Sequence, residues 1–180
     1  MSKLRSAAFA AAGVSFLLYP VLRPYADEST VAGLAVMGTT AWVVSHLLAV
    51  VGFLLVSLAL SGAARAITTA GAVLTTMYYG AETFGLYALG QRASTTPDVL
   101  KMVDAVRFHP VAIVVFAVGL LLLAVGAVVA TRGLGRIALP YAAGFVLFLP
   151  QFFTAPPVRI AHGALLLVGC FLISLKLWRS

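Results

Sequence analysis

Six apolar runs divide the chain, and short polar or turn-forming breaks separate them. A membrane-crossing helix needs about 20 consecutive, mostly apolar residues, and each run has roughly that length or more. The breaks contain glycine and proline, which end helices. The pattern therefore predicts an all-α polytopic membrane protein, a single domain built as a bundle of six transmembrane helices. The runs lie near residues 6–22, 31–60, 66–90, 110–131, 135–154 and 158–177.

The break between the third and fourth runs carries a pattern of its own. Pro97 fits the first position of a helix, and apolar residues at positions 99, 103 and 106 fall on one helical face. We therefore expect a short amphipathic helix on the outer membrane interface. Its expected role is to close the end of the bundle, and a lid over a site is the alternative.

Lysine and arginine predict the orientation of the bundle, because positively charged residues favour cytoplasmic loops. With the N-terminus inside, the inner side carries seven basic residues and no acid, whereas the outer side carries five basic residues and four acids. This bias favours an N-in and C-in topology. The inner basic residues are Lys3, Arg5, Arg65, Arg132, Arg136, Lys176 and Arg179.

Composition narrows the class of protein further. The chain is 62% hydrophobic and only 9% charged, which leaves no room for a soluble domain. The net charge of +7 comes from basic residues scattered singly between apolar runs, so nucleic acid is not an expected partner. Residues 79–86 and 151–163 resemble segments of small bacterial membrane proteins. The expected location is a bacterial plasma membrane, with the lipid bilayer as the main partner and the oligomeric state open.

Glu82 is the only acidic side chain inside an apolar run. Ionisable groups in hydrocarbon are costly, and they commonly mark functional sites. In an antiparallel helical hairpin, residues equidistant from the turn lie at the same depth. His46 and Glu82 are equidistant from the turn near Ala64, so we expect the imidazole and the carboxyl at one height. Depth alone does not determine whether they face each other.

The same construction applies to the turn between the fifth and sixth runs. Gln151 and His162 are equidistant from it and are expected at one depth in the outer half of the bilayer. Arg159 lies one helical turn from His162 and is a candidate counter-ion for an anionic head group or substrate. Tyr78 and Tyr79 lie next to Glu82 along the chain and complete the predicted polar set.

These residues allow three interpretations. In the first, His46, Glu82, Gln151 and His162 form a pocket that binds a small or lipid-soluble ligand or handles protons. In the second, the protein is a structural or accessory subunit whose polar groups only fix helix packing. In the third, it is a membrane enzyme that depends on a single haem or on a metal held by His46, Glu82 and His162. The pattern fits all three, so an enzymatic activity stays open.

Overall fold

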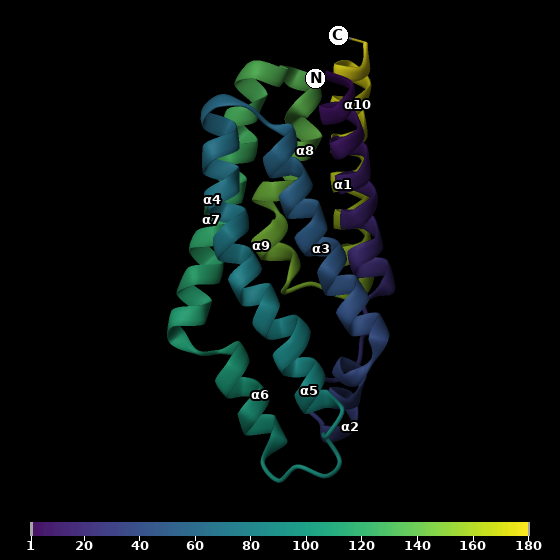
Figure 1. Ribbon diagram of the computed structural model, residues 1–180. Coiled ribbons are helices and arrows are strands. Elements are labelled where there is room, and N and C mark those ends of the chain that lie inside the picture. Colours follow the sequence, from purple (N-terminus) through teal and green to yellow (C-terminus); the bar gives the residue numbers. More distant parts are fainter. Residues whose placement is uncertain (1, 180) are drawn as a thin grey trace.

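The computed structural model describes residues 2–179, and within that range it is helical and contains no strand. Both chain ends lie at the same end of an elongated bundle (Figure 1). In the described part of the chain, four helices are long and apolar enough to cross a membrane, which indicates a membrane protein. These are α1 (Ser2–Leu22), α3 (Thr40–Ala59), α7 (Pro110–Leu134) and α10 (Pro156–Trp178).

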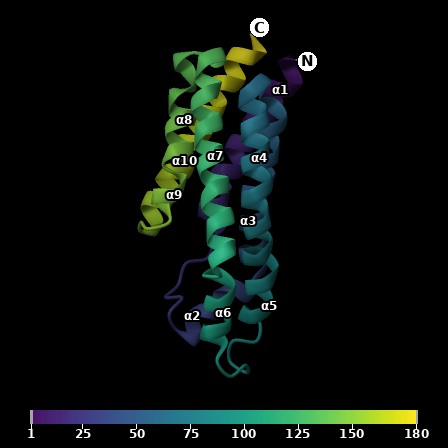
Figure 2. The same ribbon diagram turned by 90° about the vertical axis from the view of Figure 1, so that its left-hand side faces the viewer.

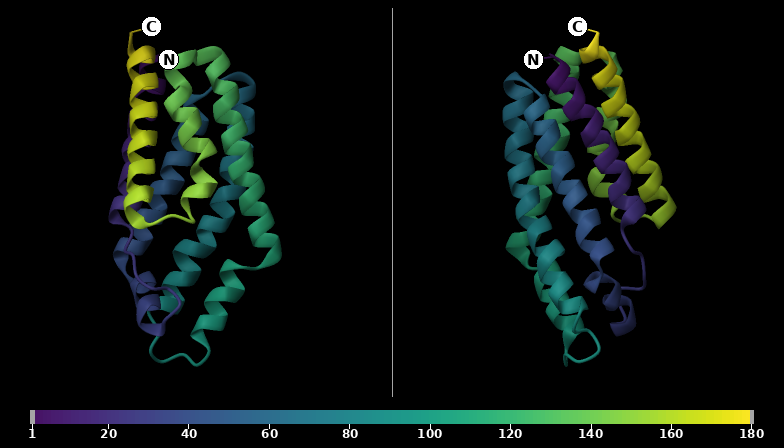
Figure 3. Two further views of the ribbon diagram at one scale, coloured as in Figure 1. Left: turned by 180° about the vertical axis from the view of Figure 1, so that it is seen from behind. Right: turned by 45° about the vertical axis from the view of Figure 1, so that its right-hand side comes forward.

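Two of the six predicted spans are not formed by a single long α-helix. The third run forms α4 (Gly62–Gly80), one π-helical turn η2 (Ala81–Gly85) and α5 (Leu86–Gly90), which follow one another without a break. The fifth run forms two short helices, α8 (Leu139–Val146) and α9 (Phe148–Gln151). Seen from behind, α9 ends well before the level that α5 reaches (Figure 3).

The remaining elements are short. The segment after α1 contains α2 (Val31–Leu34) and the 3-10 turn η1 (Ala35–Gly38), which follow each other directly. A second 3-10 turn, η3 (Arg136–Ala138), connects α7 to α8. With α5 and α6, α2 forms the end of the molecule that lies far from the termini (Figure 2).

The predicted amphipathic helix is α6 (Val99–Arg107), and it begins slightly later than expected. Asp98 takes the N-cap position with a φ of 56°, so Pro97 precedes the helix instead of starting it. Val99 and Val103 are buried in one cluster with Leu34 of α2, Met37 of η1 and Leu86 of α5. Helix α6 therefore folds back along α5 as a hairpin, which returns its C-terminal end toward the bundle (Figure 1).

Helices α4 and α7 approach each other closely because small residues line their contact (Figure 2). A Cβ added to Gly71 would lie 2.8 Å from both the Gly119 carbonyl oxygen and the Leu123 amide nitrogen. A Cβ added to Gly119 would lie 2.5 Å from the Thr75 hydroxyl oxygen. This contact fixes α4, which continues into η2, against the middle of α7.

We expect Gly71→Ala to destabilise the protein by about 1–3 kcal/mol, because the new methyl group meets backbone atoms of α7 that have no space to yield. Gly80→Ala is the matched control on the same helix, since nothing lies within 4 Å of its added Cβ. The control should be neutral or slightly stabilising, by up to about 1 kcal/mol, because alanine favours the helix. Thermal unfolding in detergent measures both variants, and equal midpoints would contradict the close α4–α7 contact.

Candidate functional site

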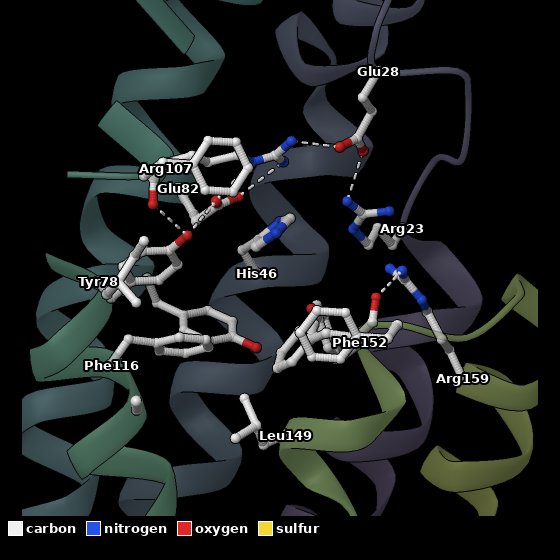
Figure 4. A pocket seen from close by; sticks show the side chains of 16 residues that line it. Arg23, Glu28, His46, Tyr78, Glu82, Arg107, Phe116, Leu149, Phe152 and Arg159 are labelled. Carbon is white, nitrogen blue, oxygen red and sulfur yellow. Dashed lines mark hydrogen bonds and ion pairs between the residues drawn. The ribbon is translucent and has the colours of Figure 1, made fainter. Parts of the chain in front are cut away.

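Nine polar side chains line a cavity of about 360 Å³, called the main cavity below. The cavity lies between α1, α3, the α4–η2 segment, α7 and α9, near the level of η2 (Figure 4). Charged groups line one end, and Phe116, Leu149 and Phe152 line the other. The polar lining residues are Tyr19, Arg23, Glu28, His46, Tyr78, Tyr79, Glu82, Arg107 and Arg159.

Four alternating charges form a continuous chain of ion pairs along the polar end. Arg107 donates two hydrogen bonds to the Glu82 carboxylate, from Nε to Oε1 at 2.9 Å and from Nη2 to Oε2 at 3.3 Å. Its Nη1 donates to Glu28 Oε2 at 2.5 Å, and the other Glu28 oxygen accepts from Arg23 Nη2 at 2.8 Å. Paired charges with several hydrogen bonds are the form in which ionic groups persist away from water.

The four members of this ion-pair chain come from different segments of the chain. Arg23 directly follows α1, Glu28 lies in the loop before α2, and Arg107 is the last residue of α6. Glu82 lies in η2, and π-helical turns within α-helices are frequent at functional sites. The Trp42 indole N–H donates to the Glu82 backbone carbonyl at 2.8 Å, which ties α3 to this turn.

Glu28 and Arg107 lie outside the spans, and their pKa values are shifted. Burial raises the pKa of Glu28, but Arg107 and Arg23 outweigh burial and hold that pKa below its usual value. Burial lowers the pKa of Arg107, but Glu82 and Glu28 outweigh it and raise that pKa. Both groups are therefore charged at neutral pH.

His46 borders the middle of the cavity, between the Glu82–Arg107 pair and Arg23 (Figure 4). Its Nδ1 lies 2.7 Å from the Trp42 carbonyl oxygen, and its ring packs on the Trp42 ring with centroids 4.2 Å apart. A carbonyl only accepts hydrogen bonds, so Nδ1 carries the proton and Nε2 presents a lone pair. Within residues 2–179, Nε2 makes no hydrogen bond.

The two adjacent tyrosines have different environments. The Tyr78 hydroxyl lies 3.2 Å from both Glu82 Oε1 and the Arg107 carbonyl oxygen, and its ring stacks on Phe116 with centroids 4.2 Å apart. Tyr79 is 2% exposed, and the polar neighbour of its buried hydroxyl is the side chain of Tyr19. Tyr78 therefore supports the carboxylate, whereas the hydroxyl of Tyr79 lies beside the side chain of Tyr19.

Arg159 also lines the cavity, and its hydrogen bonds go to backbone carbonyls alone. Its Nε donates to the Thr154 oxygen at 3.0 Å, and its Nη2 donates to the Phe152 oxygen at 2.6 Å. No acid of residues 2–179 pairs with it. The guanidinium secures the turn before α10 and leaves the cavity lining with one positive charge in excess.

The structure divides the predicted site residues between two places. His46, Glu82, Tyr78, Tyr79 and Arg159 line the main cavity. Gln151 and His162 instead line a second, largely apolar pocket of about 300 Å³ between α9 and α10.

His162 connects two helices. Its Nε2 donates at 2.8 Å to the Gly144 carbonyl, in the last turn of α8, where backbone oxygens lack partners within the helix. Because His162 lies outside the main cavity, His46, Glu82 and His162 do not form one ligand set. Within residues 2–179, no cluster of three or more His, Cys, Asp or Glu side chains is placed to hold a metal ion.

Sequence reasoning missed the partners of Glu82. Arg107, Glu28 and Arg23 are interpreted above only as charges of the outer loops, yet they complete the ion-pair chain. A signal was present, because Glu82 and Arg107 are equidistant from the centre of the turn between α5 and α6. The equal-depth rule that pairs His46 with Glu82 therefore also pairs Glu82 with Arg107.

Comparisons of the chain with protein-family models, with curated proteins and with solved structures give no match. The function must therefore be argued from the geometry of the cavity and from the chemistry of the groups that line it.

We expect Arg107→Ala to destabilise the protein by about 3 kcal/mol or more, because it leaves two carboxylates without their main partner. Lys101→Ala is the matched control on the same helix. It breaks the Lys101–Asp98 pair, whose side chains are 81% and 67% exposed, and should cost under about 1 kcal/mol. Thermal unfolding in detergent measures both variants, and similar losses would show that Arg107 is not a structural centre.

Glu28→Gln should make stability less sensitive to acid. Because the pKa of Glu28 is lowered by folding, its ion pairs contribute fully above the unfolded value of about 4.3 and are lost as pH falls through the folded value. The difference in unfolding midpoint between wild type and Glu28→Gln should therefore be largest near neutral pH and shrink below about pH 4. Asp104→Asn, an exposed acid outside the ion pairs, should show no such pH-dependent difference.

Proposed function

We propose that the protein is a multi-pass membrane protein whose main cavity binds a lipid-soluble, amphipathic ligand. One observation carries the proposal: a single cavity joins a charged and hydroxyl-rich end to an aromatic and aliphatic end. Pockets of a few hundred Å³ with apolar walls and a few convergent polar groups are typical ligand sites. A ligand with a polar head and an apolar tail matches both ends.

The rim of the cavity supports entry from the hydrocarbon phase. Phe153, Phe108 and Ile113 line the cavity and are 86%, 61% and 42% exposed. Large apolar side chains exposed beside a pocket are expected where the surroundings are lipid. We propose that the ligand enters between the start of α7 and the turn after α9, with its tail against Phe116 and Phe152.

The proposed topology comprises six crossings with both ends in the cytoplasm. The two termini lie at the same end of the bundle, which suits an even number of crossings (Figure 1). In this topology α4–η2–α5 and α8–α9 supply the two remaining crossings, and the cavity lies in the outer half of a bacterial plasma membrane. Proton handling is less favoured than ligand binding, because Arg107 and Tyr78 already occupy both oxygens of Glu82.

A cavity-filling variant tests the proposed function. Three pyrene-labelled decyl probes that end in an alcohol, a carboxylate or a methyl ester are titrated into the purified protein in lipid nanodiscs. At least one probe should bind saturably, and Ala117→Trp should weaken that binding at least tenfold, because Ala117 lines the cavity. Val125→Trp is the control on the same helix, at a 49% exposed position outside the cavity, and should bind like wild type.

Thermal unfolding of the tryptophan variants verifies that they are folded. Saturable binding that Ala117→Trp and wild type share would place the ligand elsewhere and overturn the proposed function. The absence of saturable binding for all three probes would do the same.

A further inference from the structure

We propose that the head group of the ligand is a carboxylate, bound between the guanidinium groups of Arg23 and Arg159. This inference rests on the proposed function and adds the chemical class of ligand: a single-chain amphiphile with one negative charge, such as a long-chain fatty acid. It starts from the charge of the cavity lining. Three arginines line the main cavity against two glutamates, so the lining has one positive charge in excess.

Arg159 supplies this unmatched charge. Both glutamates of the lining pair with Arg107 or Arg23, and no acid of residues 2–179 forms an ion pair with Arg159. Its Nε and Nη2 donate to neutral backbone carbonyls, and its Nη1 donates to no atom in the described part of the chain. A charge that is shielded from water is costly without a counter-ion, so this position favours an anion.

Arg23 presents further unused donors at the same end of the cavity. Its Nη2 donates to Glu28, whereas its side-chain Nε and Nη1 donate to no atom of residues 2–179. These unused nitrogens of Arg23 and Arg159 keep solvent-accessible surface, whereas the hydroxyl of Tyr79 has none. A ligand in the cavity can therefore reach the nitrogens of both arginines.

The two guanidinium groups lie close to one aromatic ring, and the Arg159 side chain extends toward Arg23 (Figure 4). Their Cζ atoms lie 5.1 Å (Arg23) and 5.8 Å (Arg159) from the centroid of the Tyr25 ring. The Tyr25 hydroxyl donates to the Pro20 carbonyl at 2.9 Å, which holds the ring in place. Like charges repel, whereas an oxyanion between two such forks accepts hydrogen bonds from both.

An acid outside the ion-pair chain does not replace the ligand. Arg23, Tyr25 and Arg159 also line a smaller pocket of about 280 Å³, and Asp27 borders that pocket. Asp27 is exposed, and its Oδ1 accepts from the backbone and the hydroxyl of Ser29 at 3.1 Å and 2.6 Å. Water therefore screens its charge, and it forms no ion pair with either arginine.

A carboxylate fits this position better than other head groups. Its single charge equals the excess of the lining, and its two oxygens accept from two guanidinium groups at once. An alcohol or an ester accepts hydrogen bonds but leaves the excess charge unpaired. An ammonium group would add to that excess, and a phosphate monoester brings up to two negative charges to a lining with an excess of one.

The position of Arg159 also sets the direction of the tail. Its bond to the Phe152 carbonyl places the cation beside the apolar end of the cavity. The Phe152 and Phe116 rings follow, with centroids 5.6 Å apart (Figure 4). A chain whose head lies at Arg159 therefore runs along these two rings, where the proposed function places the tail.

The three pyrene-labelled decyl probes test the inference, because they share a tail and differ only at the head. At about pH 8, where a carboxyl of ordinary pKa is ionised, the carboxylate should bind at least about tenfold more tightly than the alcohol or the methyl ester. Unlabelled decanoate should displace it. Inorganic phosphate at the same concentration should not, because it lacks the tail.

Arg159→Gln is the diagnostic variant, because it removes the charge without breaking an ion pair. It should weaken carboxylate binding about tenfold or more and leave methyl ester binding within about twofold. Arg159→Lys keeps the charge and should recover part of the carboxylate binding. Arg92→Gln is the control: it removes an equal charge at an exposed position outside the cavity and should bind all three probes like wild type.

The outcomes distinguish the inference from the proposed function. Equal binding of all three probes, still weakened by Ala117→Trp, would leave the proposed function standing and overturn the carboxylate inference. Tighter binding of the alcohol or the ester would do the same, and so would displacement by inorganic phosphate. The absence of saturable binding by every probe would overturn both.

The variants separate a bound head group from two other roles of Arg159. Equal loss of all three probes in Arg159→Gln would show that the arginine only secures the turn before α10. Equal loss of the carboxylate in Arg159→Gln and Arg92→Gln would show a general effect of net charge. Either result would overturn the inference.

Discussion

The pairing of Glu82 with Arg107 is the constraint on which the part of the structure far from the termini depends. A carboxylate carried by an apolar helix needs a cation, and the fold supplies one by returning α6 along α5 until its last residue reaches η2. Arg107 then holds Glu28, and Glu28 holds Arg23 at the end of α1. One ion-pair chain thus closes the polar end of the cavity and joins three segments that are distant in sequence.

Apolar runs and turn residues predicted much of the fold, because both follow from local chemistry. Four of the six runs form helices that can cross a membrane. The fifth run was expected as one span, but the chain breaks at Leu147, because Pro150 cannot donate a backbone hydrogen bond to the Val146 carbonyl, and α9 then ends at Gln151. Hydropathy measures burial in lipid and contains no information about such interruptions.

The candidate site shows what the equal-depth construction can and cannot supply. It placed His46 and Glu82 at one level, and both border one cavity. It also placed Gln151 and His162 at one level, yet these face a separate pocket, because rotation about a helix axis is set by packing against neighbours. Arg107 was missed because a basic residue in a loop was interpreted only as a topology signal, without asking how far the hairpin folds back.

The π-helical turn at Ala81–Gly85 has a consequence for how this chain tolerates change in length. Such a turn holds one residue more than an α-helical turn, so it offsets the rotational phase of everything after it by about 100°. Removing one residue there would let α4 and α5 merge into a single regular helix while turning Leu86 away from its buried seat beside Leu34 and Met37. The segment α4–η2–α5 therefore depends on its number of residues as well as on its apolar sequence, because one additional residue sets the direction in which the side chains of α5 point.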